Sequence, residues 1–263
     1  NQRARALGLP VIEALFNLET ANEICQNIGR FDFALARHTL EHVPDCRDFV
    51  MSAYKILEDD GSLLIEVPDT DVILDDLHLH EIWDEHKSYF TKHSLSNLLI
   101  SCGFEIQYMS SFKFRETKNL VCLAKKVVNK RVFNSCQEND MNVFNERVTT
   151  MNYNWITLKK KLSEKLITTK GPIFSLGASH TQVNFLNFSQ CFKYVDYFVD
   201  DDPYKAGKFL KFDVLKKIVY SNELINHRGP GVVLDTAFLY PEWAENLKTK
   251  LHSQWKIIKI FPA

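Results

Sequence analysis

The sequence lacks the features that mark proteins of membranes and of nucleic acids. Its 263 residues hold 32 Lys and Arg against 33 Asp and Glu, a formal charge of −1. This balance gives no electrostatic case for nucleic acid or an anionic membrane as the main partner. The longest apolar runs, such as residues 62–67, are far shorter than the ~18 residues that a membrane-spanning helix requires.

Paired cysteines are missing as well. The six cysteines contain no C-x-x-C pair, which argues against a zinc module and a disulfide framework and is typical of a reducing compartment. They are Cys25, Cys46, Cys102, Cys122, Cys136 and Cys191. We therefore expect a cytoplasmic protein. A hydrophobic content of 45% and a charged content of 25% exclude disorder and low complexity, and the length predicts one large or two medium domains.

The first part of the chain alternates short apolar runs with helical patterns. We expect an apolar strand at Pro10–Ala14, a helix from Asn17, a buried strand at Phe31–Ala36, a helix at Asp48–Leu57, a turn at Glu58–Gly61, a buried strand at Ser62–Val67, an insertion at Asp69–Thr91, a helix at Ser94–Ser101, and closing strands at Phe104–Met109 and Leu120–Ala124. This order predicts an α/β sheet with an antiparallel tail.

The rest of the chain predicts a bridging helix and a second, smaller α/β unit. Residues 127–169 are polar, with Trp155, Leu158, Leu162 and Leu166 at spacings of 3 and 4. The expected strands of the second unit are Ile173–Leu176, Tyr194–Val199, Gly231–Leu234 and Trp255–Ile260, and its expected helix is Pro241–Leu251.

The residues that can carry chemistry follow the first strands, because open α/β sheets bind ligands at the carboxyl ends of their strands. Arg37 and His38 follow one strand, Glu66 ends the next, and the insertion holds Glu85 and His86. An imidazole is the natural proton acceptor near neutral pH. A loop rich in charged residues is, however, more often only a solvated surface.

The string His38-Thr39-Leu40-Glu41-His42 matches the H-x-x-E-H pattern of one class of zinc peptidases. That chemistry requires both histidines on one face of a continuous helix. Here His38 directly follows a strand and Pro44 comes soon after His42. We therefore expect no zinc site of this kind and assign no metal.

The second unit offers weaker signals. The turn Gly177-Ala178-Ser179 resembles a dinucleotide-binding turn that lacks most of its glycines, which is poor evidence for phosphate binding. The run Asp200-Asp201-Asp202 could address a ribose or a cation. A charged, proline-terminated strand end is the simpler interpretation, and we favour it.

Three segments resemble Rossmann-like S-adenosylmethionine (SAM)-dependent methyltransferases. FDFALARHTLEHVPD at 31–45 resembles their fourth-strand motif, and LEDDGSLLIEVP at 57–68 resembles their fifth strand. The segment 83–91, with the pattern EH-x-x-YFT, is similar to sugar C-methyltransferases that act on nucleotide-linked 4-keto-deoxysugars. The stretch 177–208 resembles the C-terminal lobe of the same family.

The resemblance implies an organisation and a cofactor. The implied fold is a partial Rossmann-like methyltransferase sheet followed by a second, smaller Rossmann-like α/β lobe. The implied domains are a truncated SAM-dependent methyltransferase domain at 1–126, a helical linker at 127–169 and a C-terminal lobe at 170–263. SAM is the implied cofactor, and a nucleotide sugar is the implied substrate.

The resemblance also implies a role for each of ten residues. His86 matches the general base that removes the proton next to the keto group, Glu85 its partner, and His42 a histidine near the developing enolate. Fixed donors stabilise such an enolate, whose carbon then attacks the methyl group. The residues implied to line the SAM pocket are Ala36, Arg37, His38 and Glu66, and those implied to contact the substrate are Trp83, Tyr89 and His180.

Because of two departures from the family pattern, the sequence does not determine which substrate is methylated. Trp83 stands where the family usually has Tyr, and its ring N–H cannot accept a hydrogen bond. His180 replaces a lysine of the second lobe. Methylation of oxygen or nitrogen in another small molecule is therefore an alternative, and a non-catalytic sugar-nucleotide-binding protein is another.

The start of the chain predicts weak cofactor binding. The first residue is Asn1 and not Met, and no glycine-rich loop or acidic strand end precedes Pro10. We expect a fragment whose first sheet has an unpaired internal edge and which is inactive alone. Calorimetry should show weak or no SAM binding by these 263 residues and clear binding by a longer parent protein. Micromolar binding of SAM by this chain would contradict the expectation.

Overall fold

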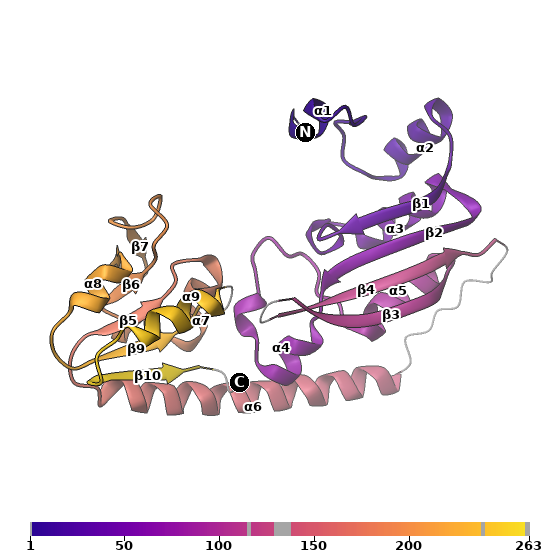
Figure 1. The fold of residues 1–263 in the computed structure, drawn as a ribbon. Helices are drawn as coiled ribbons and strands as arrows, with labels where there is room; N and C mark the ends of the chain where they lie inside the picture. Colours follow the sequence, from indigo (N-terminus) through magenta and orange to yellow (C-terminus); the bar gives the residue numbers. More distant parts are fainter. Residues whose placement is uncertain (1, 115–116, 129–137, 238–239, 261–263) are drawn as a thin grey trace. The chain divides into compact units, whose positions relative to one another are not determined.

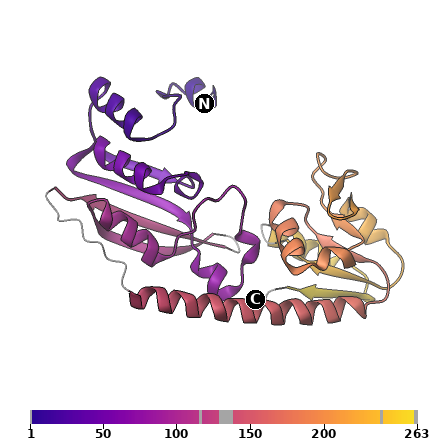
Figure 2. The same cartoon turned by 180° about the vertical axis from the view of Figure 1, so that it is seen from behind.

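The computed structural model describes residues 2–114, 117–128, 138–237 and 240–260, which fold into two compact units, each with its own sheet (Figures 1 and 2). The first unit comprises Asn1–Asp71, Glu85–Phe112 and Lys118–Met141. The second comprises Val72–Asp84, Lys113–Thr117 and Asn142–Ala263. The fold is α/β, and both sheets are mixed.

The first unit has the predicted parallel start and antiparallel tail. Its elements are α1 (Gln2–Ala6), α2 (Leu18–Asn27), β1 (Phe31–Arg37), the 3₁₀ helix η1 (Leu40–His42), α3 (Cys46–Ile56), β2 (Leu57–Pro68), α5 (Lys92–Ser101), β3 (Phe104–Phe114) and β4 (Thr117–Lys126). The strand order is β1-β2-β4-β3, with β1 parallel and β4 antiparallel to β2. The closing strands are longer than expected.

Side-chain caps explain where these helices begin. Asn17 accepts a hydrogen bond from the backbone N–H of Thr20 at the start of α2, and Asp45 accepts one from Asp48 at the start of α3. Thr91 and Ser94 form a reciprocal capping box at the start of α5. Each cap satisfies an N–H group that has no partner within the helix.

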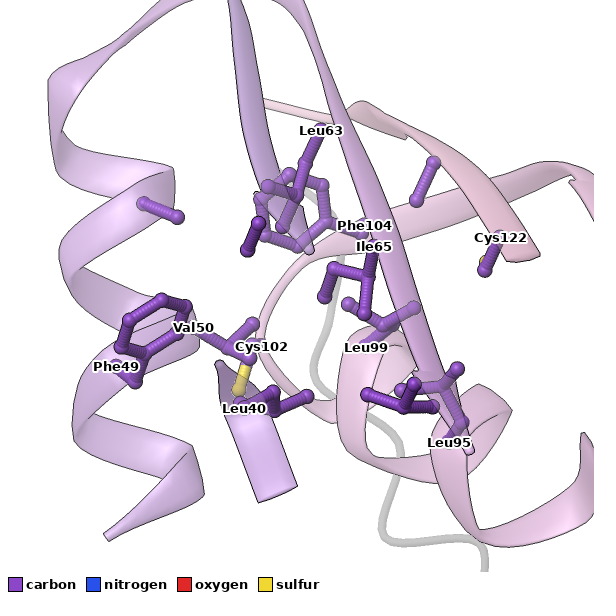
Figure 3. Packing of buried hydrophobic residues seen from close by; sticks show 14 of the residues in the cluster. Leu40, Phe49, Val50, Leu63, Ile65, Leu95, Leu99, Cys102, Phe104 and Cys122 are labelled. Atoms are coloured by element: carbon purple, nitrogen blue, oxygen red, sulfur yellow. The ribbon is translucent and has the colours of Figure 1, made fainter. Parts of the chain in front are cut away.

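The core of the first unit lies on one face of the sheet. Alternate residues of β2, including Leu63 and Ile65, point to this face and are fully buried. They pack against Val50 of α3 and against Leu95 and Leu99 of α5 (Figure 3). Burial of such aliphatic side chains stabilises the unit by about 1.5–3 kcal/mol each, and it fixes which face of β2 meets the core.

Two expectations for the first unit are wrong. Pro10–Ala14 is irregular and not a strand, because Pro10 lacks an N–H and no strand among the described residues pairs with the segment. The segment Glu58–Gly61 is not a turn between elements. It belongs to β2, whose register against β1 jumps from Phe31↔Leu57 to Phe33↔Ser62, so the extra residues form an irregularity within the strand.

The strand β1 forms where expected but is not buried. Phe33 is 51% exposed and Leu35 is 62% exposed, while Ala36 faces the core. The reason is that β1 lies at the edge of the sheet, and no described element covers its second face. That this edge results from missing strands stays a prediction.

This exposed strand makes a testable prediction. Leu35→Lys should raise the soluble monomer fraction, measured by size-exclusion chromatography, because exposed apolar edge strands promote association. Its effect on the free energy of unfolding should stay within about 0.5 kcal/mol. The control Leu63→Ala, in the core, should cost about 2–5 kcal/mol. Equal destabilisation by both variants would contradict the exposure of β1.

The second unit is built around a six-stranded sheet. Its elements are α4 (Asp71–Asp76), η2 (Leu79–Glu81), α6 (Glu138–Ile167), β5 (Ile173–Leu176), α7 (His180–Ser189), η3 (Cys191–Tyr194), β6 (Tyr197–Val199), β7 (Phe209–Lys211), β8 (Leu215–Val219), α8 (Ser221–Asn226), β9 (Gly231–Asp235), α9 (Pro241–Thr249) and β10 (Trp255–Lys259). The order is β10-β9-β5-β6-β8-β7, and only β7 pairs antiparallel.

The order in which the strands are added to this sheet reverses at β5. It proceeds from β5 through β6 to β8 on one side and then returns to β9 and β10 on the other. Such a reversal leaves a crevice at the carboxyl ends of the central strands. The strands β5, β9 and β10 and the helix α9 were predicted from the sequence. The strand β6 starts later than expected because Cys191–Tyr194 forms η3, and the lysine-rich strand β8 was missed.

The expected bridging helix exists as α6, but much of it is packed and not a free linker. Leu162 and Leu166 are buried against Ile173 and Phe185, and the Trp155 ring lies 5.9 Å from that of Phe185. The helix runs beside β10 in both views (Figures 1 and 2). Although α6 is 30 residues long, neither it nor any other helix in the described ranges is apolar enough to cross a membrane.

Candidate functional site

The side chain of Glu66, in β2, contacts three other side chains at the carboxyl end of β1. Arg37 donates from Nε to Glu66 Oε2 at 2.7 Å, and Asn119 donates from Nδ2 to Oε1 at 2.8 Å. His38 Nε2 lies 3.4 Å from the same Oε1. The register explains the first pair, since Arg37 and Glu66 are neighbours across the two strands. The structure therefore brings Arg37 and His38, which follow the buried Ala36, together with Glu66 of the neighbouring strand. It adds Asn119, which the sequence did not predict.

The ring of His38 is held by partners on both nitrogens. Asn119 Nδ2 lies 3.2 Å from Nε2, and Glu41 Oε1 lies 3.3 Å from Nδ1. The tautomer with its hydrogen on Nδ1 gives each of these two contacts a donor and an acceptor. The backbone of His38 has φ +46°, in the left-handed region. Non-glycine residues in this region cost about 1–3 kcal/mol and cluster at functional sites.

The predicted catalytic residues come together in the first unit. The backbone N–H groups of Lys87 and Ser88 donate to the carbonyl oxygen of Glu41 at 2.7 and 3.1 Å, which joins the insertion to η1. The carbonyl of Glu85 lies 3.1 Å from His42 Nδ1. The rings of His42 and His86 are 4.9 Å apart at 70°. Since a carbonyl only accepts, His42 Nδ1 carries a hydrogen, and Nε2 of the neutral ring has a lone pair.

Glu41 is the second residue of the candidate site that the sequence did not single out. Its side chain is only 1% exposed, and Oε2 is buried without a hydrogen-bond partner among the described residues. Oε1 lies 3.8 Å from His42 Nε2, where a buried carboxylate can balance a positive charge on that ring. In the sequence, Glu41 stands out only as part of the H-x-x-E-H string. The zinc chemistry that this pattern indicates requires a continuous helix, which the sequence does not predict here.

The predicted substrate residues fall into both units. Trp83 and His180 belong to the second unit, where their rings stack at 3.9 Å and 25°. Asn184 of α7 donates to the carbonyl of Ile82 at 2.8 Å and holds this segment in place. Tyr89 belongs to the first unit, and its ring lies 5.8 Å from that of His86.

The aspartates that follow β6 form hydrogen bonds and an ion pair within the second unit. Asp200 accepts from the N–H of Ala178 at 3.0 Å and pairs with Lys205 at 2.9 Å. Asp202 accepts from the N–H of Tyr204. These bonds agree with the favoured interpretation of a charged strand end. Of the cysteines, the five within the described ranges are free, and Cys136 lies outside them.

A cavity of about 410 Å³ lies beside Asp201 in the second unit. Its lining is Asp201, Ser221, Glu242, Trp243, Asn246, Leu247 and Lys250. Partial burial raises the pKa of Asp201, but hydrogen bonds from the Ser221 N–H and the Trp243 indole outweigh it, so the pKa lies below its ordinary value. The carboxylate is therefore a fixed negative charge in the cavity wall at neutral pH.

Comparison with known proteins finds a family match that lies mostly in the first unit. Residues 8–108 match the family described as "Methyltransferase domain". The C-methyltransferase NovU of Streptomyces niveus is 30% identical over 99 residues, 38% of this chain and 24% of that protein. The chain thus spans about a quarter of this relative. The methyltransferase class predicted from the sequence agrees with the descriptions of both matches.

Solved structures of methyltransferases match a similar share of this chain. A SAM-dependent methyltransferase from Methanosarcina mazei is 23% identical with a TM-score of 0.31, over 38% of this chain and 60% of that one. The 1,6-didemethyltoxoflavin-N1-methyltransferase of Burkholderia thailandensis, solved with its substrate and S-adenosylhomocysteine, is 22% identical with a TM-score of 0.30, over 37% of this chain and 44% of that one.

The residues at the end of β1 fit one wall of a SAM site. Ala36 is a small, buried residue at the strand end, and Arg37 and Glu66 place a cation and a carboxylate beside it, paired with each other at 2.7 Å. A glycine-rich loop against the carboxypropyl group and an acidic strand end for the ribose do not occur in the described part of the first unit. The described residues therefore provide part of the site only.

The amide of Asn119 makes a testable prediction. Asn119→Ala should lower the free energy of unfolding by about 1–3 kcal/mol, because it removes a buried amide that donates to the charged Glu66 carboxylate and contacts His38. The control Asn22→Ala, on the exposed surface of α2, should change it by at most about 0.5 kcal/mol. Urea unfolding measures both, and an Asn119 variant as stable as the control would contradict the assigned network.

Proposed function

We propose that the protein is a SAM-dependent methyltransferase that methylates carbon in a nucleotide-linked keto-deoxysugar. The observation that carries the proposal is the pair of imidazoles at the carboxyl end of β1, with the His42 and His86 rings 4.9 Å apart. The match to the methyltransferase-domain family and the partial likeness to a C-methyltransferase support it. The free cysteines support a cytoplasmic location.

His86 is the proposed general base. A carbon that bears only hydrogen is not nucleophilic, so the proton next to the keto group must be removed first. The ring of His86 is half-buried and lies between those of His42 and Tyr89, which limits its orientations. A base with a fixed orientation loses less entropy when it meets the substrate proton.

His42 is the proposed group that stabilises the enolate oxygen. Its Nδ1 hydrogen is used by the carbonyl of Glu85, so only the protonated ring can donate from Nε2. The buried Glu41 carboxylate, 3.8 Å from Nε2, can balance that positive charge. The exposed Glu85 side chain is proposed to hydrogen-bond a substrate hydroxyl. When SAM is bound, it supplies an electrophilic methyl group, and Ala36, Arg37, His38 and Glu66 are proposed to hold it.

The second unit is proposed as a smaller Rossmann-like lobe that contacts the substrate. Its strand order, with the reversal at β5, supports the Rossmann-like description. The stacked Trp83 and His180 are proposed to contact the sugar nucleotide, because flat rings of this kind pack well against sugars and bases. Tyr89 of the first unit is proposed as a further substrate contact. The domain limits 1–126, 127–169 and 170–263 remain a proposal, since α6 from Asn142 onward clusters with the second unit.

Proton exchange tests the proposed base without a methyl donor. A thymidine- or uridine-diphosphate 4-keto-deoxysugar, incubated with the protein in heavy water, should exchange its α-proton, as followed by proton NMR. His86→Gln should slow this exchange by about 10²–10⁴-fold. The control His93→Gln, on the exposed surface of α5, should leave the rate unchanged.

The same experiment separates the alternatives. A protein that methylates its substrate with SAM but does not exchange the α-proton would be an O- or N-methyltransferase. A protein that binds the sugar nucleotide but neither exchanges nor methylates, even as part of a longer parent protein, would be a non-catalytic binding protein. An unchanged exchange rate in the His86 variant would overturn the assignment of the base.

A further inference from the structure

The cavity beside Asp201 lies away from every residue that the proposed methyl transfer uses. Its volume of about 410 Å³ is in the range of small-molecule binding sites. All of its lining residues belong to the second unit, so the cavity is formed within one compact unit. It is therefore a candidate for a separate binding site.

Three elements bring the lining residues together. Asp201 follows β6, and Ser221 begins α8 directly after β8. Because β6 and β8 are parallel neighbours, the ends of the two strands from which these residues continue lie side by side. The helix α9 contributes residues spaced by three or four positions, which share one face of a helix. With Lys250, which caps the helix, they are Glu242, Trp243, Asn246, Leu247 and Lys250.

The Asp201 carboxylate is fixed in the cavity wall. Oδ1 accepts a hydrogen bond from the N–H of Ser221 at 2.8 Å, and Oδ2 accepts one from the indole N–H of Trp243 at 2.9 Å. An ionised carboxylate has about four acceptor positions, so these bonds leave room for a donor from a ligand. The same bond also orients the indole ring. Groups that are already oriented lose less conformational entropy when a ligand binds.

The mixture of polar groups in the lining selects the kind of ligand. Asp201 and Glu242 only accept hydrogen bonds, Lys250 only donates, and Asn246 does both. An anion would meet the two carboxylates, and an organic cation would meet the ammonium group of Lys250. A hydroxyl group donates and accepts at once, so neighbouring hydroxyl groups on an uncharged ring match this mixture. The Trp243 ring supplies a surface for the apolar face of such a ligand.

From these features we propose that the cavity binds an uncharged ring with vicinal hydroxyl groups, as found in carbohydrates and in the ribose of nucleosides. The carboxylates of Asp201 and Glu242 accept hydrogen bonds from the hydroxyl groups. Asn246 and Lys250, whose side chains are exposed, donate to the hydroxyl oxygens. The inference goes beyond the proposed methyl transfer and does not depend on it, since the two sites share no residue.

NMR titration of the ¹⁵N-labelled protein, without SAM, tests the site. The chain has four tryptophans, and the indole signal of Trp243 is identified by its loss in Trp243→Phe. Uridine or methyl α-mannopyranoside should shift this signal in a saturable manner. The 2-deoxy analogue of the probe that binds should bind about 10–100-fold more weakly, because it loses a hydrogen bond to a charged group. A response to uridine alone would identify a nucleoside, and a response to the mannoside alone a carbohydrate.

Substitutions test the assigned contacts. Asp201→Asn keeps the side-chain volume but removes the charge, and it should weaken binding about 10–100-fold. The control Asp213→Asn makes the same charge change at an exposed position outside the cavity and should bind as the unaltered protein does. Because Asp201 also holds Ser221 and Trp243, the exposed Asn246→Ala is a second variant, expected to bind about 2–10-fold more weakly without disturbing the fold.

Several results would overturn the proposal. They are a Trp243 signal that neither diol probe shifts, equal affinity for a diol and its deoxy analogue, full affinity in Asn246→Ala, and tighter binding of inorganic phosphate or tetramethylammonium than of either diol. Loss of the Trp243 shift in Trp83→Ala would also overturn it, because Trp83 lies outside the cavity. The titration requires neither methyl transfer nor proton exchange, so its failure is distinguishable from failure of the proposed function.

Discussion

The candidate site depends on the two hydrogen bonds that the carbonyl oxygen of Glu41 accepts from Lys87 and Ser88. They join a loop to a short helix that follows β1, although more than 40 residues separate the two segments in the chain. A loop of this length loses much conformational freedom when it is fixed. Backbone bonds to a buried residue hold it in one register, which sets the 4.9 Å spacing of the His42 and His86 rings.

The rigid support for this arrangement comes from the sheet below it. The parallel pairing of β1 with β2 places Arg37 beside Glu66, and the antiparallel β4 places Asn119 within reach of both Glu66 and His38. Side chains from three strands therefore meet at one sheet edge. Within this group the buried Asn119 amide connects the Glu66 carboxylate to the His38 imidazole.

Much of this fold followed from the sequence, and the failures have physical causes. Periodicity and caps located α2, α3, α5 and the strands β1, β2, β5, β9 and β10, because these patterns are local. The exposure of Phe33 and Leu35 was not predictable, since an apolar strand looks the same whether or not a neighbour covers it. Asn119 and Glu41 were missed for a similar reason, because their roles arise only when β4 and η1 meet the end of β1.

The proposed role of His42 depends on the groups around its ring. Its Nδ1 donates to the carbonyl of Glu85, so Nε2 can donate to a substrate oxygen only when both ring nitrogens carry hydrogen. Oε1 of the buried Glu41 lies 3.8 Å from Nε2, where a carboxylate stabilises such a positive charge. The proposed stabilisation of the enolate oxygen therefore requires Glu41 as well as His42, although Glu41 itself need not touch the substrate.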